Sequence, residues 1–350
     1  MKRGTWVEAL RLLPRLRENG STELSRECRE TLQWFRDPLS HPDLAAMTVT
    51  QLADLPFSPA VAAANETPLA RRIGEKEHAM TLPDTYLLGR AEAEETRLKR
   101  QIANLAPDSD AQLEAIGIKP GERVVDLGCG PGGALHLLAK HAGPAGSVLG
   151  IERSPHFVEL ARRFVTDRGL THVEVREGDA YNTGLPRASF DGAHMRLVLV
   201  NVPEPERMVR EMVSLVRPGG WLASFEADYL PHTCDPPLPA WTRLLDAYKS
   251  YAAAEGIDLF VGRRTHRLFR DAGVVDIRVD PVVHVYPAGH DRRTILRDFM
   301  NNVRDKLVSK EFITAAEFDS DIGALENHLA RPEVLVTSHM FYRLSGRVPL

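Results

Sequence analysis

The sequence predicts an α/β protein with a Rossmann-like, doubly wound sheet of seven strands. From residue 122 onward, short apolar segments alternate with amphipathic segments of about 10–15 residues, which is the pattern of parallel strands joined by crossover helices. The first apolar segment runs directly into a glycine-rich turn, V-V-D-L-G-C-G-P-G-G at 124–133. Such a turn is typical of the first strand-to-helix junction in this class. We also expect an N-terminal helical extension and a helical lid inserted after the fifth strand.

The individual elements follow from this alternation. We expect the first five strands at 123–127, 148–152, 173–177, 190–199 and 221–226, and helices at 133–142, 155–168 and 204–216. Two later segments with alternating apolar residues, 274–285 and 334–344, are expected to complete the sheet. Helical insertions at about 232–272 and 291–330 follow the fifth strand. There they would cover the carboxyl edge of the sheet and enclose a substrate pocket.

Residues 1–83 predict a helical extension that precedes a main domain at 84–350. The segment 5–18 has an apolar helix face, and such a face must pack against another surface. The extension is therefore expected to form either a wall of the active site or the interface of a homodimer. A longer helix is expected to begin after Pro83, and a short one is expected at 110–117.

Composition narrows the classes of partner. The chain has 350 residues, 43% of them apolar, and a net charge of -4, so no electrostatic attraction to nucleic acid is expected. Three widely spaced cysteines argue against a disulfide framework and favour a reducing, cytoplasmic location. The N-terminus has charges but no apolar segment, so we expect no signal peptide, and no apolar run is long enough to predict a membrane span.

Three acidic residues follow three successive predicted strands and indicate the ligand of the glycine loop. Asp126 precedes G-x-G-x-x-G at 128–133, a spacing that also satisfies the dinucleotide fingerprint. A carboxylate at this point suits an ammonium group and would repel a pyrophosphate. Glu152 is placed to accept both hydroxyls of a ribose, and Asp179 to accept from an exocyclic amine. S-adenosylmethionine fits all three, whereas NAD does not, so an NAD-linked oxidoreductase is a remote alternative.

These motifs together carry a resemblance to a known family. Residues 122–226 resemble the core of a class I S-adenosylmethionine-dependent methyltransferase, through V-V-D-L-G-C-G-P-G-G, L-G-I-E-R-S, E-G-D-A, F-D-G-A-H-M-R-L-V-L and R-P-G-G-W-L in this order. The chain is more closely similar to the ubiquinone/menaquinone-biosynthesis type and its relatives in bacterial natural-product pathways. That similarity includes Y-L-L-G-R at 86–90 and S-G-R-V-P near the C-terminus, and it covers residues 84–349. Residues 1–80 do not resemble the winged-helix dimerisation domain of many O-methyltransferases.

The resemblance implies a set of cofactor-binding residues. Asp126 and the backbone of Gly128 would hold the methionine amino group, Glu152 the ribose, and Asp179 with Ala180 the adenine. The full set that the resemblance implies consists of Tyr86, Asp126, Gly128, Gly130, Glu152, Arg153, Asp179, Ala180, Arg196 and Leu197. Within this set, Arg196 and Leu197 would line the cofactor, and Tyr86 would close over it from the preceding helix.

The expected reaction is methyl transfer to oxygen, carbon or nitrogen of a small molecule, such as a natural product or a quinone. Positioning and desolvation do most of the work in this displacement, and a base is needed only if the acceptor must lose a proton early. Candidate catalytic residues near the carboxyl edge are His194, Glu226, Asp228, His232 and His284, each of which could instead be structural. His232 and Cys234 lie close together, but no zinc spacing is met, so we expect no metal.

Two further alternatives stay open at the level of sequence. A methyltransferase fold can hold S-adenosylmethionine as a positive charge while the protein carries out a cyclisation or pericyclic step. A binding or regulatory protein with a degenerate site is the other, and the intact acids at all three strand ends argue against it. Neither the acceptor nor the methylated atom follows from the sequence.

Overall fold

The computed structural model describes residues 92–230 and 232–350. The expectations for the N-terminal extension, including the role of Tyr86, lie outside the described residues. None of the helices within the described part combines the length and the apolar character that crossing a membrane requires.

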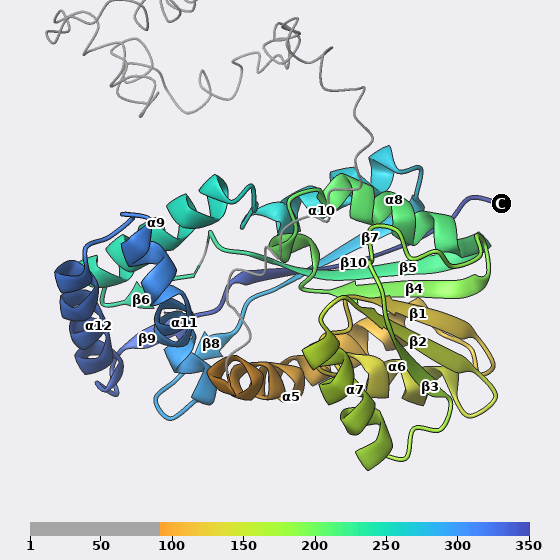
Figure 1. Cartoon of the computed structure of the whole chain (residues 1–350), viewed down its shortest axis with the longest axis horizontal. Coiled ribbons are helices and arrows are strands. Elements are labelled where there is room, and N and C mark those ends of the chain that lie inside the picture. Colours follow the sequence, from red (N-terminus) through yellow and green to blue (C-terminus); the bar gives the residue numbers. More distant parts are fainter. Residues whose placement is uncertain (1–91, 231) are drawn as a thin grey trace, which may run out of the picture. The chain divides into compact units, whose positions relative to one another are not determined.

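A seven-stranded sheet forms the centre of the described structure and confirms the predicted fold (Figure 1). Its strand order is β3-β2-β1-β4-β5-β10-β7. The first five strands are parallel, and β10 pairs antiparallel with both β5 and β7. The strands are β1 (Arg123–Leu127), β2 (Ser147–Glu152), β3 (Val173–Glu177), β4 (Phe190–Arg196), β5 (Val216–Asp228), β7 (Val275–Val282) and β10 (Met340–Arg347).

Helices cover both faces of this sheet, as a doubly wound fold requires. One face packs against α5 (Glu92–Ile116), α6 (Leu135–Ala142) and α7 (Pro155–Asp167), and the other against α8 (Pro205–Leu215) and α10 (Val261–Asp271) (Figure 1). Neighbouring residues of β1 belong to different cores, because successive side chains of a strand point to opposite faces. Val124 packs with Trp221 and Leu135 in one core, while Val125 packs with Phe225 in the other.

Most of the two segments inserted after β5 forms a cap at one end of the sheet, whereas α10, the last part of the first segment, packs on the face of the sheet (Figure 1). Both predicted insertions are helical and contain α9 (Pro239–Ala254), α11 (Ile295–Ser309) and α12 (Ala315–Leu329), which pack on one another. A short helix, η5 (Asp291–Thr294), precedes α11, and a small sheet of β6 (Cys234–Asp235), β9 (Leu335–Thr337) and β8 (Val285–Tyr286) joins the cap. The sequence did not predict this small sheet because strands of two or three residues have no readable alternation.

Helix α5 corrects one prediction. Instead of two helices separated near residue 107, the chain forms one helix of 25 residues with Pro107 inside it. Tertiary contacts immediately after the proline hold this stretch in place. Ser109 Oγ accepts from Arg196 Nη1 at 2.9 Å, and the Gln112 side-chain amide donates to the carbonyl oxygens of Ser224 and Leu344 at 3.0 and 2.9 Å. Contacts of this kind outweigh the local penalty of proline.

Strand β4 is shorter than predicted and ends at Arg196. Leu197 has a left-handed backbone, with φ of 56°, which turns the chain out of the strand and into the short helix η4 (Leu199–Asn201). Glu226 of the neighbouring strand holds this turn through its side chain, which is described below. The chain therefore bends at the carboxyl edge of the sheet, directly beside the glycine loop.

Candidate functional site

The glycine loop after β1 forms one side of the site. Its glycines include Gly128 and Gly130, with φ of 68° and 55°, values that residues with a side chain rarely adopt. The backbone N–H groups of Gly128 and Cys129 donate to the Ile151 carbonyl at 2.8 and 3.1 Å, which ties the loop to β2. A Cβ on Gly128 would lie 2.7 Å from Cγ2 of Val198, so the loop also approaches the turn after β4 very closely.

The three predicted carboxylates, Asp126, Glu152 and Asp179, line one cavity at the carboxyl edge of the sheet. Glu152 Oε2 accepts from the Gly130 N–H at 3.0 Å, and its Oε1 accepts from the N–H of Ser154, the N-cap of α7, at 2.8 Å. Asp179 Oδ1 accepts from the Tyr181 N–H at 2.9 Å. These backbone bonds fix the direction of both carboxylates in the absence of any ligand contact.

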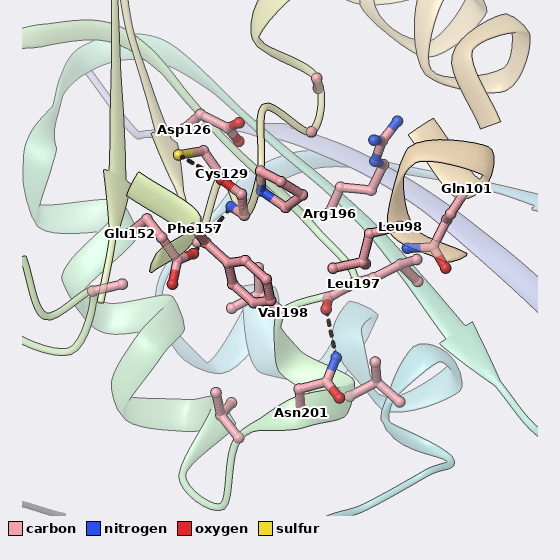
Figure 2. A pocket seen from close by; sticks show the side chains of 18 of the residues that line it. Leu98, Gln101, Asp126, Cys129, Glu152, Phe157, Arg196, Leu197, Val198 and Asn201 are labelled. Atoms are coloured by element: carbon pink, nitrogen blue, oxygen red, sulfur yellow. Dashed lines mark hydrogen bonds between the residues drawn. The ribbon is translucent and has the colours of Figure 1, made fainter. Parts of the chain in front are cut away.

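Every predicted cofactor-binding residue within the described part of the chain lines this cavity. They are Asp126, Gly128, Gly130, Glu152, Arg153, Asp179, Ala180, Arg196 and Leu197. Figure 2 shows Asp126, Glu152, Arg196 and Leu197 arranged around the opening. Burial lowers the pKa of Arg196 to about 10, although the nearby carboxylate of Asp126 acts in the opposite direction.

The carboxylate of Asp126 forms a hydrogen bond with the imidazole ring of His194. The two side chains are buried, and Nδ1 of His194 hydrogen-bonds with Oδ1 of Asp126 at 2.7 Å. His194 itself does not line the cavity. It therefore orients the carboxylate of Asp126, which lines the cavity.

Glu226 and Asp228 at the end of β5 are also turned away from the cavity. Glu226 accepts the N–H groups of Val198 and Leu199 at 3.0 Å each and that of Val200 at 3.2 Å, and so fixes the turn after β4. Burial raises the pKa of Glu226 to about 7 because it outweighs these three hydrogen bonds. Asp228 is fully buried and forms an ion pair with Arg263 of α10.

The last two candidate catalytic residues, His284 and His232, also contact other protein side chains. His284 Nε2 hydrogen-bonds with Asp108 Oδ2 at 2.7 Å. His232 lies between Trp241 and His339, with ring centroids 4.8 and 4.2 Å away, and burial lowers its pKa to about 3. None of the five candidates lines the cavity, so a catalytic role for them stays a prediction and the geometry does not support it.

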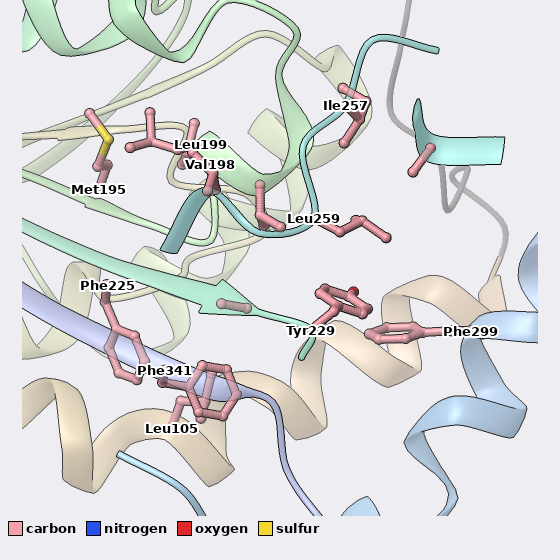
Figure 3. Close-up of a cluster of buried hydrophobic side chains, with 14 of the residues drawn as sticks. Leu105, Met195, Val198, Leu199, Phe225, Tyr229, Ile257, Leu259, Phe299 and Phe341 are labelled. Carbon is pink, nitrogen blue, oxygen red and sulfur yellow. The ribbon is translucent and has the colours of Figure 1, made fainter. Parts of the chain in front are cut away.

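The other end of the cavity was not predicted from the sequence. It is lined by residues from several elements, namely Arg97, Tyr229, Arg292, Phe299, His339 and Phe341. The rings of Tyr229 and His339 lie 4.1 Å apart, and Tyr229 stacks on Phe299 with centroids 6.4 Å apart. Figure 3 shows Tyr229 beside Phe299 at the end of the apolar cluster that also contains Phe341. This end therefore has flat, apolar walls, which suit an aromatic molecule.

The positions of Tyr229 and His339 relative to the predicted strands could have indicated part of this aromatic end from the sequence. Tyr229 follows the fifth strand and His339 lies within the last predicted strand segment. Antiparallel pairing of Met340 with Asp228 brings both residues to the same edge of the sheet. The direction of the last strand, which determines this placement, does not follow from its alternation.

The three carboxylates of the cavity fit a nucleoside ligand that carries no phosphate. Carboxylates end β1 and β2 and a third follows β3, and a pyrophosphate placed on the glycine loop would face Asp126 and Glu152 directly. An ammonium group, ribose hydroxyls and an adenine amine are the partners that such acceptors favour. Fold and site together have the features expected of a class I S-adenosylmethionine-dependent methyltransferase domain.

Comparisons with known proteins agree with this class. Residues 125–224 match the family described as "Methyltransferase domain". The chain is 31% identical over 139 residues to a demethylmenaquinone methyltransferase of Listeria monocytogenes, covering 40% of this chain and 56% of that protein. It is 34% identical over 225 residues to an uncharacterized 37.1 kDa protein in transposon TN4556 of Streptomyces fradiae, covering 63% of this chain and 64% of that protein. Residues 125–224 thus match a methyltransferase domain, and the chain is similar over 139 residues to a demethylmenaquinone methyltransferase, which supports S-adenosylmethionine as the cofactor.

The chain spans less than two thirds of the length of both of these relatives. Among solved structures, a phosphoethanolamine N-methyltransferase of Haemonchus contortus is 16% identical, with a TM-score of 0.46, and covers 69% of this chain and 53% of that one. The [4+2]-cyclase SpnF is 20% identical, with a TM-score of 0.42, and covers 69% of this chain and 82% of that one.

Proposed function

We propose that the chain transfers a methyl group from S-adenosylmethionine to a small-molecule acceptor, of the quinone or natural-product type. The observation that carries this proposal is the division of one cavity into two chemically different ends. Asp126, Glu152 and Asp179 line one end, and the rings of Tyr229, Phe299 and Phe341 line the other. A cofactor at the carboxylate end would face a planar acceptor at the aromatic end.

At the carboxylate end the chain would bind and orient the cofactor. Asp126, fixed by His194, would accept from the amino group, while Glu152 and Asp179 would accept from the ribose and the adenine. The bound cofactor supplies a methyl group on a positively charged sulfur. The residues around it need only hold the acceptor in line and exclude water.

The burial of the aromatic end supports this role. Tyr229, Phe299, His339 and Phe341 are each 5% exposed or less. A compartment of this kind removes water from the acceptor, which strengthens the electrostatic attraction between an electron-rich acceptor atom and a cationic methyl donor. No general base is assigned, because the five predicted candidates lie outside the cavity lining.

Binding of the demethylated cofactor is the first test. Isothermal titration with S-adenosylhomocysteine should give a 1:1 complex, and NAD should give none. Asp126→Asn should weaken S-adenosylhomocysteine at least about tenfold, because an amide is a poor partner for an ammonium group. Asp191→Asn is the matched control, since Asp191 pairs with Arg217 outside the cavity.

Product analysis separates methyl transfer from its alternative. Transfer produces one S-adenosylhomocysteine for each methylated product. A cyclisation that uses the cofactor only as a charge would change the substrate and leave S-adenosylmethionine intact.

A further inference from the structure

Arg292 at the aromatic end is a buried cation that forms no ion pair with an acidic residue of the described part of the chain. It lies in η5, is 6% exposed and lines the cavity. Its side chain donates from Nε to the Tyr286 hydroxyl at 3.0 Å, and its guanidinium lies over the Tyr286 ring at 5.9 Å. Among the ion pairs formed by the described residues, none includes Arg292.

Arg97 and Arg196, two of the three other arginines that line the cavity, differ from Arg292 in this respect. Arg97 is paired with Glu94 at 2.6 Å, and Arg196 has the carboxylate of Asp126 nearby. Asp291, next to Arg292 in sequence, is about half exposed and accepts from Asn104 at 3.0 Å. The hydrogen bond from Asn104 is the main cause of the lowered pKa of Asp291 and the charge of Arg292 is the last, so Asp291 interacts with Arg292 electrostatically but forms no ion pair with it.

Apart from Asp291, the groups that lie close to Arg292 include the rings of Tyr286, His232 and His339. Burial, the neighbouring His232 and the charge of Arg292 keep the pKa of His339 well below its usual range, so His339 is neutral at pH 7. The pKa of His232 is also low, through burial and then Arg292. His339 Nε2 is buried and has no hydrogen-bond partner among the described residues. A buried cation and a buried, unpartnered ring nitrogen in one cavity both call for a ligand oxygen.

We propose that Arg292 is the residue that selects the acceptor, and that the acceptor is a planar aromatic anion carrying a carboxylate or an ionised hydroxyl group. The inference rests on the proposed function and specifies its substrate class. The guanidinium would pair with the ionised oxygen, Tyr229 and Phe299 would pack on the ring, and His339 Nε2 would hydrogen-bond with the acceptor. Arginine suits this task because its planar fork matches an ionised oxygen in a desolvated site.

The competing assignment is that Arg292 binds the methionine carboxylate of the cofactor. Arg196 is the better candidate for that carboxylate, because it ends β4 beside Asp126. Arg292 is close enough to act electrostatically on Arg196, but its side chain hydrogen-bonds with Tyr286 and lies near His232 and His339. The two assignments differ in what an Arg292 substitution does to cofactor affinity, so the experiment measures that affinity separately.

The test uses the full chain saturated with S-adenosylhomocysteine and isothermal titration of two probe pairs. The carboxylate pair is 2-naphthoate against 2-naphthamide, and the hydroxyl pair is 4-nitrophenolate against 4-nitroanisole. At least one anion should bind the wild-type chain about tenfold or more tightly than its neutral partner. The pair that shows this preference identifies which ionised group the site takes.

Three variants make the result specific to Arg292. Arg292→Gln should remove the preference for the anion and leave the affinity for S-adenosylhomocysteine within about twofold, while Arg292→Lys should keep part of the preference. Arg297→Gln is the control, since Arg297 pairs with Asp298 and lies outside the cavity lining, and it should behave as wild type. Thermal shift adds an independent readout: the preferred anion should stabilise the wild-type chain and not Arg292→Gln.

Three results would overturn the proposal. They are equal binding of anion and neutral partner in both pairs, an unchanged preference in Arg292→Gln, or a loss of S-adenosylhomocysteine affinity in that variant. If Arg292→Gln fails to fold, the wild-type and Arg292→Lys preferences still decide the question. Turnover of neutral acceptors alone would refute the anionic acceptor and leave methyl transfer intact, so the two failures are distinguishable.

Discussion

The close approach of the glycine loop to the turn after β4 gives a prediction that can be worked through quantitatively. Gly128 has a φ of 68°, and a Cβ there would lie 2.7 Å from Cγ2 and 3.2 Å from Cγ1 of Val198. We predict that Gly128→Ala destabilises the fold by two separate effects. The left-handed backbone costs about 1–2 kcal/mol for a residue with a side chain, and the overlap with Val198 adds about 1–3 kcal/mol of overpacking.

A matched variant separates these two effects. Gly169 also has a left-handed backbone, with φ of 61°, and a Cβ there would meet nothing within 4 Å. Gly169→Ala should therefore lose only the backbone part, about 1–2 kcal/mol. Urea unfolding followed by circular dichroism measures both losses, and isothermal titration should show weakened S-adenosylhomocysteine binding for Gly128→Ala alone.

A double-mutant cycle then tests the contact itself. Val198→Ala removes both methyl groups that the new Cβ would contact. The double variant should therefore lose less free energy of unfolding than the two single variants lose in sum, by about 1 kcal/mol or more. Equal losses for the two glycine variants, or strict additivity with Val198→Ala, would refute the reasoning. Either result would mean that the two loops do not constrain each other.

Three further outcomes follow from the same contacts. Because burial raises the pKa of Glu226 to about 7, above its ordinary 4.5, this carboxyl stabilises the fold most below about pH 4.5. About 3 kcal/mol of that contribution is lost as the pH rises to about 7. Urea unfolding between about pH 5 and 8 should show this loss for wild type and not for Glu226→Gln. His194→Phe should weaken S-adenosylhomocysteine about tenfold or more in titration, because Asp126 loses its buried partner at 2.7 Å. Gln112→Leu should lower the free energy of unfolding by about 1–3 kcal/mol, since it leaves the carbonyls of Ser224 and Leu344 without their donor.

The grouping of the carboxylates at one end of the cavity could be predicted because its information is local. Asp126 and the glycines that follow it lie within a few residues of one another, and Glu152 and Asp179 follow predicted strands whose carboxyl ends must meet at one edge. Parallel topology alone therefore brings these side chains together. The structure places all of them in one cavity lining.

The aromatic end of the cavity could not be predicted in the same way. Arg292, Tyr229 and His339 come from three segments that alternation does not orient toward one another, and their placement depends on how the cap folds over the sheet. The candidate bases were chosen because they lie near the ends of strands. A position near the edge does not fix the direction of a side chain, and Glu226 turns back toward the backbone of the neighbouring turn.

Helix α5 illustrates a third kind of limit. Two helices are expected here, and Pro107 lies at the break between them, where it removes a helical hydrogen bond. The break does not occur because Ser109 and Gln112 are held by Arg196 and by the backbone of β5 and β10. Contacts between residues more than 80 positions apart in the sequence decide this outcome, and local propensity does not contain them.

The most direct test of the account is methyl transfer followed with S-adenosylmethionine labelled in its methyl group. The full chain is incubated with this cofactor and a panel of aromatic anions and their neutral counterparts, and product and cofactor are analysed together by mass spectrometry. We predict a product that gains one labelled methyl group, with one S-adenosylhomocysteine formed for each product. A transformed substrate of unchanged mass, with S-adenosylmethionine intact, would contradict the account.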